Sequence, residues 1–162
     1  MPSPRAKSAT KHVTAESAST TPVRTIMSRD VVTVRSGTSL DAVVELMLAR
    51  GLSRVPVVDE EFRPLGIVSK TDVVEDVHDR GDTAEVPVQR AERGFHVQVE
   101  GAVVDEVMTK TIVSAPEDAS VQRVAELMVS RHVHGLPVVN ARGELTGFVS
   151  TMDVLAWLAG LR

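Results

Sequence analysis

The stretch Val104–Leu155, which reads VDEVMTKTIVSAPEDASVQRVAELMVSRHVHGLPVVNARGELTGFVSTMDVL, decides the fold because it repeats an earlier stretch of the same chain. The earlier copy is Val23–Val74 and reads VRTIMSRDVVTVRSGTSLDAVVELMLARGLSRVPVVDEEFRPLGIVSKTDVV. The two copies align without a gap, so that Asp153 stands 81 residues after Asp72. Chance can supply one short match, but ELM, PVV and V-S-x-x-D recur in the same order. Two copies of one structural unit are therefore expected.

Each copy predicts the same order of elements: a short initial helix, a strand, a helix, two strands and a last helix. In the first copy, apolar residues recur at the i, i+3, i+4 and i+7 spacing of one helix face: Leu40, Val43, Val44 and Met47. The predicted strands are the short apolar runs 31–34, 55–58 and 66–69 in the first copy and 112–114, 136–139 and 147–150 in the second. A unit this small buries little of its own apolar surface, so the copies are expected to pack together as an α+β fold.

The rest of the chain is assigned to a tail and a connector. The predicted boundaries are 1–21 for a disordered polar tail, 22–76 for the first repeat, 77–102 for a connector and 103–162 for the second repeat. The connector is charged and is expected to cross between the repeats. The alternation of Phe95, Val97 and Val99 in it indicates a short strand.

Composition and charge argue against several functions. The net charge is -4 at pH 7 and aromatic residues make up 2% of the chain, so neither a basic nor a stacking surface for nucleic acid is expected. The chain contains no cysteine, which rules out disulfides, cysteine-ligated zinc and thiol nucleophiles. No apolar run approaches the roughly 18–20 residues of a membrane span, and the polar N-terminus lacks the apolar centre of a secretory signal. We therefore expect a cytoplasmic protein without nucleic-acid or membrane partners.

The motifs in this order resemble the CBS domain, and two copies in tandem resemble a Bateman module. The resemblance implies a pseudo-twofold pair of βαββα repeats that pack sheet to sheet and leave two related clefts between them. It further implies a regulatory sensor, not an enzyme, that binds an adenosine-containing ligand: AMP, ADP, ATP, S-adenosylmethionine or a cyclic di-AMP type of messenger. A homodimer acting on an unknown effector protein is expected, and no cofactor is required beyond such a bound ligand.

Two aspartates are the candidates for binding a ribose. Asp72 and Asp153 each follow a strand-ending serine by three residues, at a strand-to-helix junction. A carboxylate there can accept hydrogen bonds from both hydroxyls of a ribose. The serines, Ser69 and Ser150, are the matching candidates for a phosphate group at the start of the helix. The ordinary alternatives are a helix cap for the aspartates and turn formation for the serines.

The residues before the PVV strands differ between the copies. The first copy has Ser53 and Arg54 there, whereas the second has His134 followed by glycine. The resemblance implies that Arg54 and His134 contact phosphate, with Ser53 beside them and with Lys70 and His132 as supplements. Each copy then has only one of the two expected cations, which suggests unequal sites. A solvated surface charge is the ordinary alternative for Arg54 and Lys70.

Apolar residues near these positions would form the wall that a purine needs. The candidates for this adenine pocket are Val32, Val113, Leu52 and Val133. For all of them, packing in the core is the alternative.

Three other functions remain as alternatives on the sequence. His132 and His134 have the spacing of a His-x-His metal site, but such a site needs further ligands, and no metal is expected. The chain lacks the G-x-S-x-G, Walker and G-x-G-x-x-G patterns, so no catalytic residues are assigned. The incomplete set of cations in each copy leaves open a ligand-free module that dimerises or docks on a partner.

Overall fold

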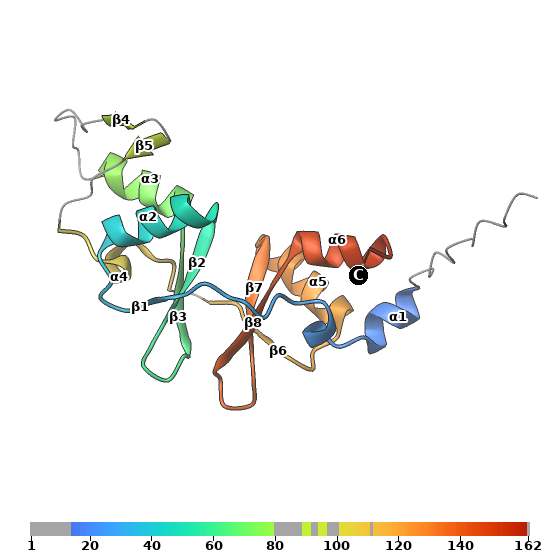
Figure 1. Cartoon of the computed structure of the whole chain (residues 1–162). Helices are drawn as coiled ribbons and strands as arrows, with labels where there is room; N and C mark the ends of the chain where they lie inside the picture. Colours follow the sequence, from blue (N-terminus) through green and yellow to red (C-terminus); the bar gives the residue numbers. More distant parts are fainter. Residues whose placement is uncertain (1–13, 80–88, 92–93, 97–100, 111, 162) are drawn as a thin grey trace, which may run out of the picture.

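The computed structural model describes residues 14–79, 89–91, 94–96, 101–110 and 112–161, and it consists of two lobes that lie side by side (Figure 1). The first lobe contains β1 (Val34–Arg35), α2 (Leu40–Arg50), β2 (Arg54–Val58), β3 (Pro64–Ser69) and α3 (Lys70–Asp79). The second lobe contains β6 (Ala115–Pro116), α5 (Val121–Arg131), β7 (Gly135–Val139), β8 (Leu145–Ser150) and α6 (Thr151–Leu158). This order confirms the α+β fold class and the duplicated pattern of elements.

Each lobe is built on a three-stranded sheet of the same topology. The strand orders are β1-β2-β3 and β6-β7-β8. In both sheets the first strand runs parallel to the second, and the second runs antiparallel to the third. Both sheets also shift register at the corresponding place, between Val57 and Val58 and between Val138 and Val139. The sequence repeat therefore extends to the irregularities of the sheets.

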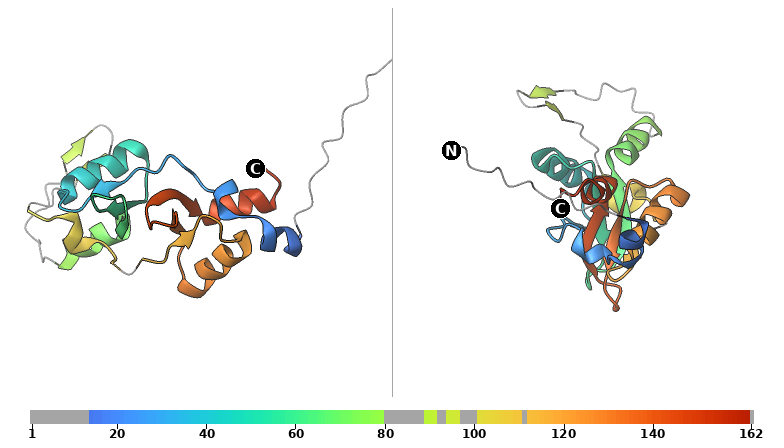
Figure 2. Two further views of the ribbon diagram at one scale, coloured as in Figure 1. Left: turned by 90° about the horizontal axis from the view of Figure 1, so that it is seen from below. Right: turned by 90° about the vertical axis from the view of Figure 1, so that its right-hand side faces the viewer.

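The first strand of each lobe begins later than the sequence predicts. The prediction of a strand at 31–34 is confirmed only at Val34, where β1 starts, and the prediction at 112–114 was wrong, because β6 starts at Ala115. Only Val34 and Arg35 pair with β2, and the half-buried residues 31–33 belong to no strand. These residues cross from the second lobe to the first (Figure 2). Because β-branched residues favour extended chain whether or not it is paired, the sequence did not separate the crossing segment from the strand.

The main helices of the two lobes begin alike and end differently. The hydroxyl groups of Ser39 and Ser120 cap α2 and α5 by accepting a backbone N–H three residues later. Helix α2 ends at Gly51 with a φ of 64°, whereas α5 ends at His132 with a φ of 53°. Glycine adopts this left-handed conformation readily, while other residues do so at a cost of about 1 kcal/mol. The second copy therefore holds a histidine in a strained position.

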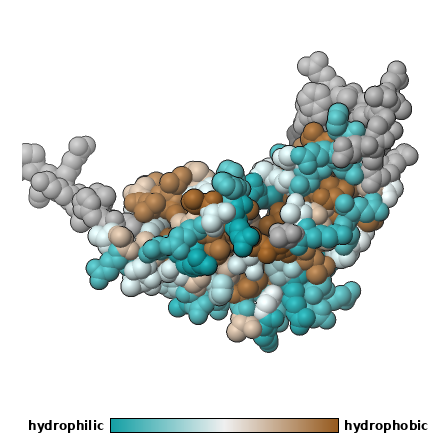
Figure 3. Space-filling view, turned by 180° about the vertical axis from the view of Figure 1, so that it is seen from behind, coloured by the Kyte–Doolittle hydropathy of each residue, from teal (hydrophilic) through white to brown (hydrophobic). Residues whose placement is uncertain are grey.

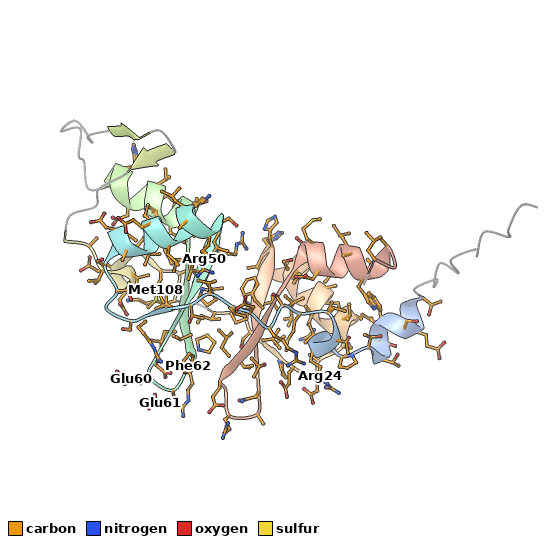
Figure 4. The ribbon with its side chains drawn as sticks, viewed as in Figure 1. Arg24, Arg50, Glu60, Glu61, Phe62 and Met108 are labelled. Carbon is orange, nitrogen blue, oxygen red and sulfur yellow. The ribbon has the colours of Figure 1, made fainter. Side chains whose placement is uncertain are left out.

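The initial segment of each copy packs into the lobe formed by the other copy. The initial segment of the first copy is residues 22–28, which includes the 3-10 helix η1 (Val23–Thr25), and that of the second is residues 103–109, which includes α4 (Val104–Val107). Met27 belongs to the core of the second lobe, and Met108 belongs to the core of the first. Figure 1 places α4 beside the first lobe, and Figure 4 shows Met108 inside it. The initial helices thus leave their own repeats.

Backbone hydrogen bonds fix this exchange. Ile67 and Thr109 donate to each other's carbonyl groups at 3.1 and 2.9 Å, and Ser28 and Phe148 do so at 2.9 Å in both directions. Each initial segment therefore adds a short antiparallel bridge to the third strand of the other lobe. Val23 and Val104 are fully buried. Separating the lobes would expose their apolar surface to water, which costs about 25 cal/mol of free energy per Å². The side chains that face each other across the boundary are consequently held in place.

The tail and the connector are described only in part. The predicted disordered tail, 1–21, contains a short helix, α1 (Ala15–Thr20), whose start is capped by the Thr14 hydroxyl and which lies against α5. The prediction was therefore wrong for residues 15–20, and residues 1–13 lie outside the described residues. In the connector, β4 (Gln89–Ala91) pairs with β5 (Gly94–His96). The predicted strand is present at Phe95, while Val97 and Val99 lie outside the described residues.

Candidate functional site

A cleft opens between the two lobes and is lined by both. Its volume is about 200 Å³. From the first lobe it receives Arg54, Ile67, Ser69 and Asp72. From the second copy it receives Thr109, Val113 and the turn between α5 and β7, His132–Gly135. Because Thr109 lies in the exchanged initial segment, the crossing of the chain helps to form the cleft.

Asp72 lies in the first turn of α3, directly after β3 ends. Its Oδ2 accepts hydrogen bonds from the backbone N–H of Ser69 at 2.6 Å and from the Ser69 hydroxyl at 2.7 Å. The Ser69 Oγ in turn accepts from the Asp72 N–H at 3.3 Å, so the two residues cap the helix reciprocally. Oδ1 of Asp72 receives no hydrogen bond from the part of the chain that the structure describes. One oxygen of this carboxylate therefore caps the helix, and among the described residues the other has no donor.

Three basic side chains surround the same cleft. Arg54 begins β2, is half-buried, and stands opposite Ser69 in the sheet register. His132 ends α5, and His134 directly precedes β7, where its carbonyl accepts the N–H of Thr151 at 3.0 Å. Both histidine side chains are exposed. A guanidinium group and two imidazoles can therefore approach one bound anion.

The apolar part of the lining consists of half-buried branched residues. Ile67 comes from β3 of the first lobe, whereas Val113 and Val133 come from the second copy. The volume of about 200 Å³ is smaller than the roughly 300 Å³ at the lower end of small-molecule pockets. A nucleotide would therefore either project from the cleft or open it by moving the lobes apart.

The structure gathers half of the predicted site residues. The ones that line this cleft are Arg54, Ser69, Asp72, Val113, Val133 and His134, together with the supplement His132. The ones that do not line it are Val32, Leu52, Ser53, Lys70, Ser150 and Asp153. The sequence has one of the two expected cations in each copy. The structure brings Arg54 of the first copy and His134 of the second into a single cleft.

Sequence reasoning did not assign Ile67, Thr109 and Gly135 to the site, although all three line the cleft. Ile67 stands two residues before Ser69, on the same face of β3, so strand alternation was a signal for it. Nothing in the local sequence indicates that Thr109 crosses to the first lobe.

The second V-S-x-x-D motif forms the same local structure away from this cleft. Asp153 Oδ2 accepts from the Ser150 N–H at 2.8 Å and from its hydroxyl at 2.6 Å. This capping box starts α6. The motif is therefore sufficient to explain a helix start in both copies, and it does not by itself define a binding site.

Metal ligation and membrane insertion find no support in the described residues. Within these ranges, no group of three or more histidine or carboxylate side chains is placed to hold a metal ion. None of the helices there is both long and apolar enough to cross a bilayer.

Comparison with known proteins relates the chain to a family and to solved structures. The sequence model of the CBS domain family matches residues 23–79 and 104–160. Homoserine O-acetyltransferase of Methanohalobium evestigatum is 26% identical over 132 residues, which cover 82% of this chain and 23% of that protein. The chain spans between 23% and 45% of the length of this and two further curated relatives.

Two solved structures have the same fold. The structure of CBSX2 in complex with AMP has a TM-score of 0.68 and 24% identity, and the match covers 88% of this chain and 99% of that one. The CBS domain pair of protein MJ0100, in complex with 5-methylthioadenosine and S-adenosylmethionine, has a TM-score of 0.65 and 23% identity, with 85% and 98% of the chains covered.

Proposed function

The chain belongs to the CBS domain family, and on that premise we propose that it is a regulatory module which binds an adenosine-containing ligand in the Asp72 cleft. One observation carries the proposal. A carboxylate with one oxygen that accepts no hydrogen bond from the described residues, three basic side chains and an apolar wall meet in one cleft, and they come from both lobes. These are the groups that a ribose, a phosphate and a purine each require.

Each part of the cleft has a role in this proposal. Oδ1 of Asp72 accepts a hydrogen bond from a ribose hydroxyl while Oδ2 keeps its bonds to Ser69. Arg54 and His134 donate to phosphate oxygens from opposite lobes. The purine lies against the apolar wall, where backbone groups can contact its edge. The ligands that CBSX2 and the MJ0100 domain pair bind are adenosine compounds, which supports this ligand class.

Regulation follows from the position of the cleft. A ligand that contacts both lobes stabilises the arrangement in which the binding groups of the two lobes are spaced to contact it together. It can change the activity of an effector only as far as its affinity differs between two arrangements. In this proposal the chain is not an enzyme, works in the cytoplasm and transmits ligand binding to an effector protein.

We also propose that the regulatory form is a homodimer. Large apolar side chains are exposed on the outer helices of both lobes, and Figure 3 shows apolar surface on each lobe. The exposed residues of these helices are Leu48, Val74, Val129, Met152, Leu155 and Leu158. Analytical ultracentrifugation should give twice the chain mass, and the double variant Met152→Glu, Leu155→Glu should give the mass of one chain. A wild-type chain that sediments as a monomer would contradict this part of the proposal.

Isothermal titration calorimetry tests the ligand. AMP, ATP, S-adenosylmethionine and cyclic di-AMP are titrated into the full chain, and at least one should bind. At a hundred times its dissociation constant, that ligand should stabilise the fold by about 2.7 kcal/mol. The variant Asp72→Asn should weaken binding by about tenfold or more, because it removes a charged acceptor. A cooperatively folded protein that binds none of the four would overturn the proposal.

A second candidate is a ligand-free module for dimerisation or partner docking. The small volume of the cleft and the exposed apolar helices favour it. It predicts association that is the same with and without adenosine ligands. A shift in the sedimentation profile when AMP is added would exclude it.

A further inference from the structure

The sequence repeat implies a second cleft related to the first by the pseudo-twofold axis, and the residues at its positions are different. With the constant offset between the copies, the counterpart of Arg54 is Gly135 and the counterpart of Ile67 is Phe148. An arginine and a branched aliphatic residue are thus replaced by a bare backbone and an aromatic ring. Asp153 is the counterpart of Asp72 and keeps the same cap.

The ring of Phe148 takes the space beside Gly135 that a side chain there would need. A Cβ atom at Gly135 would lie 2.7 Å from Cε1 and 3.1 Å from Cζ of Phe148. Both distances are shorter than ordinary carbon–carbon contacts. The first lobe has Arg54 and Ile67 at the corresponding positions, and both line the first cleft. The second position therefore has an aromatic ring and no side chain at residue 135.

In the turn that faces the second position neither histidine has a basic counterpart, and the counterpart of Gly135 is Arg54, which lines the first cleft. The counterparts of His132 and His134 are Gly51 and Ser53. A phosphate placed beside Asp153 would meet neither of the imidazoles that line the first cleft. With fewer basic partners, removing the phosphate from water is less favourable there than in the first cleft.

We propose that each chain binds one phosphorylated adenosine ligand, in the Asp72 cleft, and that Phe148 together with Gly135 excludes such a ligand from the counterpart position. This inference rests on the proposed function, since it specifies how many of the two related clefts take the ligand. It makes Phe148 a specificity-determining residue of the second repeat.

The number of AMP molecules bound per chain tests the inference. Calorimetric titration of the wild-type chain should give one AMP. Asp72→Asn should abolish or strongly weaken this binding, whereas Asp153→Asn should leave the affinity and the number unchanged. The two variants are matched controls, because both aspartates make the same capping bonds to a serine. Any general effect of a weakened helix cap would appear in both.

A gain of binding provides the converse test. The variant Phe148→Ile removes the ring beside Gly135 and leaves Gly135, which also lines the first cleft, unchanged. It should bind a second AMP. Its thermal unfolding should remain cooperative, which shows that it is folded. A folded Phe148→Ile variant that still binds one AMP would contradict the role of Phe148.

The outcomes for the wild-type chain separate the two proposals. Two AMP molecules per wild-type chain, or loss of binding in Asp153→Asn alone, would overturn this inference while the proposed function stands. No binding of any adenosine ligand would overturn the proposed function and this inference with it.

Discussion

The thioether of Met108 lies directly against Gly66, across the exchange of segments between the two copies. A Cβ atom at Gly66 would be 2.7 Å from Cγ of Met108 and 3.1 Å from the carbonyl oxygen of Thr109. Met27 has the same relationship to Gly147, with its Cγ and Cε each 2.9 Å from such an atom. Each glycine therefore gives the methionine of the other copy room to enter the core.

The two glycines should respond differently to substitution by alanine. The three atoms nearest to a Cβ at Gly147 all belong to the flexible side chain of Met27, whereas those nearest to a Cβ at Gly66 include the backbone oxygen of Thr109. Overpacking of a core costs about 1–3 kcal/mol, and we expect Gly66→Ala to lie at the upper end and Gly147→Ala at the lower end. Urea denaturation of both variants measures the difference. Equal stability of Gly66→Ala and the wild type would show that the contact with Met108 is not tight.

Asp105 should make the stability of the chain depend on pH in the acid range. The Ser36 hydroxyl at 2.7 Å and the Gly37 N–H at 2.6 Å donate to its carboxylate and hold the pKa of Asp105 below its ordinary value of 3.8. Because the folded pKa is lower than the unfolded one, the contribution to stability is fully present above the unfolded pKa. It is lost as the pH falls through the folded pKa.

Chemical denaturation at a series of pH values checks this expectation. Asp105→Asn should be less stable than the wild type near neutral pH, and the difference should shrink as the pH falls below about 4. Ser36→Ala removes the hydroxyl donor alone and should reproduce part of the effect. A difference between wild type and Asp105→Asn that is constant with pH would refute the assignment.

His132 should show opposite effects on stability and on binding. Its left-handed backbone, with a φ of 53°, is strained, and the corresponding residue of the first copy is Gly51. His132→Gly should therefore gain stability, by up to about 1 kcal/mol. The same change removes one imidazole from the cleft and should weaken AMP binding about two- to tenfold.

Gly51→Ala is the control for the backbone effect. Gly51 has a φ of 64°, and nothing lies within 4 Å of a Cβ atom placed there. Its substitution should cost about 1 kcal/mol through backbone strain alone, without changing AMP binding. If His132→Gly were as stable as the wild type and Gly51→Ala lost nothing, the strain argument would fail at both positions.

The sequence was informative wherever structure depends on local pattern. Helix α2 follows from the spacing of Leu40, Val43 and Met47, which are all buried. The strands around the PVV motifs follow from short apolar runs, and β2 and β7 contain them. These features depend on neighbours within one or two turns or along one strand, so periodicity reports them.

Features that depend on the arrangement of the lobes could not be predicted. The exchange of Met27 and Met108 leaves no local trace, since an apolar residue after a short helix fits either core. The meeting of Arg54 and His134 in one cleft also depends on how the two sheets face each other. The sequence therefore indicated much of the chemistry of the site, but not that both cations line one cleft.

The exchange of initial segments has a consequence for the origin of the chain. A single copy on its own would carry one methionine with no glycine of a neighbouring sheet to receive it, and one sheet without its bridging segment. Two identical single-copy chains would complete each other's lobes by exchanging these segments. A gene duplication that joined such a pair end to end would make the association intramolecular. Dilution could then no longer separate the two copies.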